Sequence, residues 1–100
     1  MSVNETTCVY LLGMAGGPWK IGIAAHPHMR LEQLQTASPF ELVMYGYVYL
    51  PSRKHAVALE RSLHALLADC RLKGEWFDIV PAPVFVAMLE AEQQARAVAA

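Results

Sequence analysis

The stretch RKHAVALERSLHALLADCRLKGEWF, residues 53–77, decides the fold. Its apolar side chains recur at spacings of three and four, which is typical of one face of an α-helix; these residues are Ala56, Leu59, Leu63, Leu66 and Cys70. Residues 71–74, Arg-Leu-Lys-Gly, are expected to end the helix, because cations and a glycine C-cap suit its carboxyl terminus. Glu75, Trp76 and Phe77 then place two large aromatic side chains directly after a carboxylate.

Three polar residues lie beside that apolar face. At 100° per residue, Glu60, His64 and Arg71 fall within about 40° of one another around the helix. A carboxylate and an imidazole one turn apart can share a metal ion or a proton. The alternative is an ordinary pair on a solvated face, which stabilises a helix by only about 0.2–0.5 kcal/mol. The helix alone leaves both interpretations open.

Composition narrows the class of protein. One hundred residues predict a single domain, 1–100, and 55% hydrophobic against 17% charged residues predicts a packed core. The net charge is −1, so contact with phosphates requires a local patch of cations. No apolar run approaches the roughly 20 residues of a membrane span, and residues 1–7 lack the pattern of a signal peptide. Cys8 and Cys70 form no CxxC pair, which indicates reduced structural thiols and a cytoplasmic protein.

The expected order of elements is β-β-α-β-α-α, an α+β fold with a small three-stranded antiparallel sheet flanked by helices. Residues 8–12 and 19–24 are predicted strands, joined by a glycine-rich turn into a hairpin. A helix opens at Pro27 and stops at Ser38-Pro39, and residues 41–50 form the longest strand. The long helix follows, and a last helix covers residues 83–99. The motif-bearing part of the domain is expected within residues 8–80.

Alternation assigns the faces of two of these strands. Positions 19, 21 and 23 are apolar and share one face, and Lys20, Gly22 and Ala24 share the other. Glycine is unfavourable in mid-strand, so Gly22 indicates either a close approach to its backbone or a bulge. In residues 41–50 the even positions are expected to oppose the odd ones, which carry three tyrosines. Such tyrosines can stack bases, although a place in the sheet surface or core is favoured.

Four short pieces follow one another in a fixed order: Val9-Tyr10, Lys20-Ile21-Gly22, Arg30 and Glu60. Lys20 lies ten residues after Tyr10, and Arg30 lies eight after Gly22. This order resembles the GIY-YIG nuclease superfamily. It is most similar to a phage and bacterial subgroup with KIG in place of YIG, a helix reading A-x-x-L-E-x-x-L-H and a closing GEWF, which here occupy residues 56–64 and 74–77. The resemblance covers residues 9–79 and implies a GIY-YIG-like fold.

The resemblance implies hydrolysis of DNA phosphodiesters with one divalent metal, Mg²⁺ or Mn²⁺, held by Glu60. A hard cation that keeps most of its waters needs only one or two carboxylates. Arg30 is expected to clamp the phosphate with its planar guanidinium, and Tyr10 to orient the water or the phosphate. Gly22 would leave room for the scissile group. Two further cations are expected to bind substrate, Arg53 and Arg71.

Two departures from the family pattern concern the general base. Lys20 replaces the second tyrosine, and a lysine serves as a base only where its pKa is depressed. The histidine that often follows the arginine by one turn is absent, since that position is Leu34. His64 is the other candidate base, its alternative being a structural histidine bonded to backbone. Glu75 is either a second metal neighbour or, by preference, a residue with a capping or salt-bridge role with Arg71.

Two functions of different class follow. One is a metal-dependent endonuclease, favoured by Tyr10, Arg30 and Glu60 together, because a carboxylate facing phosphate repels it unless a metal intervenes. The alternative is a DNA-binding module of the same fold that does no chemistry, favoured by Lys20, by the absent histidine and by the net charge. A protein-interaction domain using the tyrosine strand has no motif behind it. No membrane contact is expected, and sequence selectivity would be modest or would come from a homodimer or a partner protein.

Overall fold

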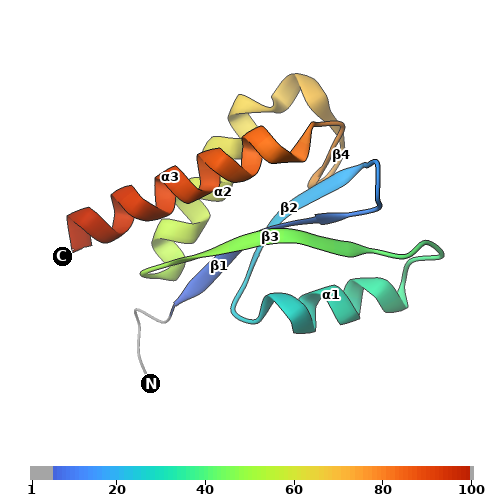
Figure 1. Ribbon diagram of the computed structural model, residues 1–100, viewed down its shortest axis with the longest axis horizontal. Coiled ribbons are helices and arrows are strands. Elements are labelled where there is room, and N and C mark those ends of the chain that lie inside the picture. The colour runs from blue at the N-terminus through green and yellow to red at the C-terminus, as the bar shows by residue number, and fades with distance from the viewer. Residues whose placement is uncertain (1–5, 100) are drawn as a thin grey trace.

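The computed structural model describes residues 6–99 as a five-stranded antiparallel sheet with three α-helices (Figure 1). The elements in chain order are β1 (Thr7–Gly13), β2 (Trp19–Ala24), α1 (Pro27–Thr36), β3 (Val43–Leu50), α2 (Arg53–Leu66), the 3₁₀ turn η1 (Ala68–Cys70), β4 (Arg71–Lys73), β5 (Trp76–Phe77) and α3 (Pro81–Ala99). The α+β class is confirmed. Residues 1–5, on which the signal-peptide expectation partly rests, lie outside the described range.

The sheet has five strands instead of the expected three, in the order β3-β1-β2-β5-β4. The extra pair comes from residues 71–77, so the prediction that residues 71–74 end the helix is wrong. Helix α2 ends at Leu66, whose side chain is 75% exposed and lies off the buried face, and the next residue, Leu67, packs against the core. Phe77 is instead fully buried by pairing with Trp19 of β2, and Gly74 makes the β4–β5 turn with φ 57°.

Two hydrophobic cores lie on opposite faces of the sheet. Helices α2 and α3 cover one face and α1 covers the other (Figure 1). The first core contains the apolar face of β2 together with buried residues of both helices, including Ala56, Leu63, Val84 and Met88. The second contains Cys8, Tyr10 and Leu12 with Leu31 and Leu34 of α1. The predicted alternation in β2 is therefore confirmed.

The alternation predicted for residues 41–50 is wrong at their amino-terminal end, because β3 contains a bulge. Leu11 pairs with Gly46 and Leu12 with Met44, so Tyr45 has no partner on β1 and the faces swap there. Met44 consequently joins the core under α1, and Tyr45 turns to the opposite face. Tyr45 packs edge-on against Trp19 at 5.6 Å between ring centroids, which separates it from the other two tyrosines of the strand.

Strand β3 forms one edge of the sheet, and a side chain of α3 covers part of that edge. The backbone N–H of Tyr49 donates to the Glu92 carboxylate at 3.1 Å, and Arg96 lies 3.6 Å from the same carboxylate. Helix α3 begins at Pro81, two residues before the predicted start. None of the helices in residues 6–99 is long and apolar enough to cross a membrane.

Candidate functional site

The site is built around a close contact between β1 and β2. Tyr10 lies directly opposite Gly22 in a regular ladder without a bulge. A β-carbon added at Gly22 would collide with the Tyr10 hydroxyl and lie 2.7 Å from Cζ of the ring. Of the two explanations for a mid-strand glycine, close approach is therefore the correct one, and the tyrosine ring is what approaches.

Tyr10 is buried, with 1% of its surface exposed. Burial raises the pKa of its hydroxyl, the guanidinium of Arg30 lowers it through hydrogen bonding and charge, and the Glu75 and Glu60 carboxylates raise it. The first cause is the largest, so the hydroxyl stays protonated and can act as a hydrogen-bond donor. These interactions link residues from β1, α1, α2 and the β4–β5 turn at one place.

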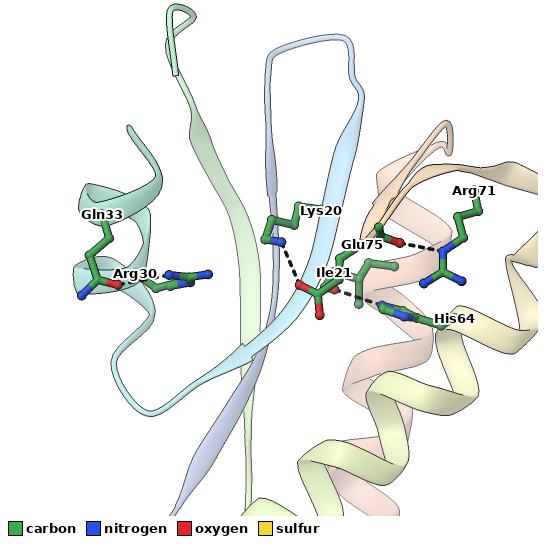
Figure 2. A network of polar contacts seen from close by, with 8 residues as sticks. Lys20, Ile21, Arg30, Gln33, His64, Arg71 and Glu75 are labelled. Carbon is green, nitrogen blue, oxygen red and sulfur yellow. Dashed lines mark hydrogen bonds and ion pairs between the residues drawn. The ribbon is translucent and has the colours of Figure 1, made fainter. Parts of the chain in front are cut away.

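Lys20 and Glu75 form an ion pair at the centre of this group. The ammonium donates to Oε1 of Glu75 at 2.7 Å, and the lysine side chain is only 10% exposed. Figure 2 shows the Glu75 carboxylate between Lys20 of β2 and His64 of α2. The expected pairing of Glu75 with Arg71 is wrong, because the β4–β5 hairpin turns the arginine back so that its Nε donates to the Gly74 carbonyl at 2.6 Å.

Glu60 faces the same place from α2. Its Oε2 is buried and has no hydrogen-bond partner among the described residues. Burial raises the pKa of Glu60, the charge of Glu75 raises it further, and His64 and Lys20 lower it. A hydrogen bond with Glu75 raises this pKa as well. A charged carboxylate with a buried unpaired oxygen is costly, and either a proton shared with Glu75 or a bound cation would compensate that cost. Glu60, His64 and Glu75 can each present one ligand atom, all within 4.8 Å of one another.

His64 is held by the sheet. Its Nε2 lies 3.0 Å from the Ile21 carbonyl oxygen, and its ring packs on Phe77 at 4.9 Å between centroids. Because a carbonyl only accepts, Nε2 carries the hydrogen, and Nδ1 of the neutral ring is left as the acceptor. The hydrogen bond to backbone that is expected if His64 is a structural histidine is therefore present. The same bond also orients the ring as second-shell contacts orient metal-binding histidines.

The remaining predicted residues divide into two groups. Arg30 extends from α1 toward the sheet, contacts Gln33 at 3.3 Å and borders a hollow of about 180 Å³. Arg53 lines a separate hollow on α2, described below. Arg71 lies on β4, so its predicted place on the helix face beside Glu60 is wrong. The structure thus groups five predicted residues, Tyr10, Lys20, Arg30, Glu60 and His64.

Sequence reasoning missed the central position of Glu75. The GEWF motif marked the residue, but its pairing with Lys20 depends on the β4–β5 hairpin, which the helical pattern concealed. The Ile21 carbonyl was missed as well, because no side-chain pattern reports a backbone acceptor.

The chain matches one known family of domains, the T5orf172 domain, over residues 7–98. The chain belongs to the T5orf172 domain family. No curated protein and no solved structure matches it. For this T5orf172 domain, the resemblance of the motif residues to GIY-YIG nucleases stays a prediction.

The residues present fit a divalent cation. Two carboxylates and one imidazole lie close together, and one carboxylate oxygen is buried without a partner in residues 6–99. Carboxylate oxygens suit Mg²⁺ and Mn²⁺, and an added imidazole is more typical of transition metals. In this T5orf172 domain, Glu60 would be the principal ligand and Glu75 the second.

Proposed function

We propose that this T5orf172 domain is a metal-dependent endonuclease, similar to GIY-YIG nucleases, that hydrolyses DNA phosphodiesters. The observation that carries the proposal is the grouping of Glu60, His64 and Glu75 beside Tyr10 and Lys20. Two carboxylates at a phosphate site repel the ligand, which argues against a protein that only binds DNA. If a cation lies between them and the phosphate, the same carboxylates hold that cation and no longer repel the ligand.

Each side chain can be given a task in that reaction. Bound Mg²⁺ or Mn²⁺ would supply Lewis-acid stabilisation of the extra negative charge in the transition state. Arg30 offers a planar pair of donors to the phosphate oxygens. The protonated Tyr10 hydroxyl can orient the phosphate or the attacking water by donating a hydrogen bond.

His64 is the better candidate for the general base. Lys20 is engaged by Glu75, so its ammonium serves as a donor and a point charge in the observed arrangement. Two carboxylates suffice for a hard cation, which leaves Nδ1 of His64 to accept the proton of the attacking water. The fixed Nε2–H on the Ile21 carbonyl keeps that acceptor available.

The alternative, a DNA-binding module without chemistry, is supported by the same ion pair. Glu75 forms an ion pair with Lys20, and Lys20 lies at the position where the family pattern has its second tyrosine. In that case the carboxylates would balance local positive charge, and no metal would be required. A homodimer or a partner protein would direct either form to its DNA.

The test compares Glu60→Gln with Glu90→Gln, a substitution of an exposed glutamate on α3. Nicking of supercoiled plasmid is measured with Mg²⁺ or Mn²⁺. We expect Glu60→Gln to lower the rate by about a hundredfold or more, on the scale of losing an essential metal ligand. Glu90→Gln should retain the wild-type rate. Wild-type protein that yields no metal-dependent nicking beyond that of Glu60→Gln would contradict the nuclease.

A further inference from the structure

Helix α2 carries a basic groove on the side away from its buried residues. The groove has a volume of about 460 Å³ and is lined by Arg53, Lys54, Val57, Ala58 and Arg61. Three of these five residues are cations and none is acidic. In the part of the chain that the structure describes, no ion pair or side-chain hydrogen bond engages the three cations. Their charges are therefore available to a ligand.

The groove begins beside the candidate site. On a helix of 3.6 residues per turn, Arg53 lies about 20° around the axis from Glu60 and about 10 Å along it. Val57 lies about 60° from Glu60 and Arg61 about 100°, in the direction away from the buried Ala56. The basic groove is thus continuous with the flank of α2 that carries Glu60 and His64. A long ligand at the candidate site could extend along it.

The chemistry of the groove favours a phosphate backbone. Val57 and Ala58 give it a small apolar floor, and none of its lining residues is aromatic, so it has no platform for stacking unpaired bases. Arg53 and Arg61 are about 12 Å apart along the axis, at about 1.5 Å per residue. A DNA strand presents one negative charge about every 3.4 Å, so several phosphates fall within that span.

We propose that the basic groove of α2 binds the sugar-phosphate backbone of duplex DNA next to the bond held at Glu60. The proposal rests on the proposed function for its position, although binding in the groove needs neither metal nor cleavage. It adds Lys54 and Arg61 to Arg53 as contacts that hold the duplex. With a net charge of −1 for the whole chain, these contacts would supply much of the attraction to DNA.

The test uses two double substitutions that remove the same charge. Lys54→Gln/Arg61→Gln alters the groove, and Lys73→Gln/Arg96→Gln removes two exposed cations elsewhere. Binding of a fluorescent duplex is measured by anisotropy in EDTA between about 50 and 200 mM salt. We expect the groove variant to lose affinity on the order of 10- to 60-fold near 0.1 M salt and its log–log salt slope to shrink by about 1.8. The control variant should bind like the wild type.

Three results would overturn the proposal. The first is an equal loss, or no loss, in the two double variants. The second is a loss seen with single-stranded DNA and not with the duplex. The third is wild-type protein that binds anionic phospholipid vesicles but no duplex at low salt. Binding is measured in EDTA and therefore does not depend on a metal. If the groove variant loses affinity but the wild type never cleaves DNA, the nuclease proposal is contradicted and the groove proposal stands.

Discussion

Replacing Gly22 with alanine places a methyl group against the Tyr10 ring. The added carbon would lie 2.7 Å from Cζ and closer still to the hydroxyl oxygen, whereas an ordinary contact begins at 3.4 Å, so the ring must retreat by at least about 0.7 Å. Tyr10 is enclosed by the core under α1, so we expect the retreat to cost about 1–3 kcal/mol of unfolding free energy. For a domain of this size, each 1 kcal/mol lowers the melting temperature by roughly 4–8 °C.

Gly46→Ala provides the matched control. Its β-carbon would lie 2.5 Å from the Phe85 ring, a similar collision between β3 and α3 that involves none of the candidate site residues. Both variants should melt at lower temperature, and only Gly22→Ala should lose metal-dependent nicking by about a hundredfold, the order expected for a misplacement of about 1 Å. Stability is measured by thermal unfolding, and plasmid nicking is measured at a temperature where both variants are folded. An equal loss of nicking activity in the two variants would refute this reasoning. A Gly22→Ala variant as stable as the wild type would refute it too.

Two further predictions concern ionisable groups. Burial raises the pKa of the Cys8 thiol above its ordinary 9.0 and that of the Tyr10 hydroxyl above 10.0. Because both groups then ionise first in the unfolded chain, the free energy of unfolding should fall as the pH rises through these values. A urea midpoint that stays unchanged between about pH 8 and 10.5 would contradict this prediction. Glu75→Gln should weaken Mn²⁺ binding by about 10- to 100-fold in calorimetric titration, because it removes one carboxylate and the partner of Lys20. A change smaller than about twofold would exclude Glu75 from the metal site.

Local patterns predicted most of the framework. Alternation in residues 19–24 and the i,i+3/i+4 spacing of α2 each report burial on one face, which the backbone period converts directly into an element. Pro27 indicates the start of α1, because its fixed φ suits the first turn of a helix. These local patterns gave wrong predictions where a contact between residues distant in sequence determines the structure. Residues 71–73 have a helical composition, but they form a strand that pairs with β5, where Arg71 lies opposite the buried Phe77. Tyr45 looks like any strand residue, and its bulge depends on the pairing with β1.

The candidate site shows the same division. The motif spacing named Tyr10, Lys20, Arg30, Glu60 and His64, and the structure places all of them in one connected group. The pattern could not assign partners, because the pairing of Lys20 with Glu75 and of His64 with a backbone carbonyl depends on how β5 and α2 meet β2. Arg71 was misplaced because its predicted position assumed that the helix continued.

The carboxylate of Glu92 on the outer edge of β3 affects how copies of the domain meet in solution. An edge strand of eight residues presents backbone groups to which another strand could add, and such additions lead to aggregation. A strand that joined this edge would have to displace Glu92 from the Tyr49 amide and bring its own backbone up to a negative charge. The opposite edge, β4, has only three residues. Self-association by extension of the sheet is therefore disfavoured at both of its edges, and a dimer of this domain would form more readily through another surface.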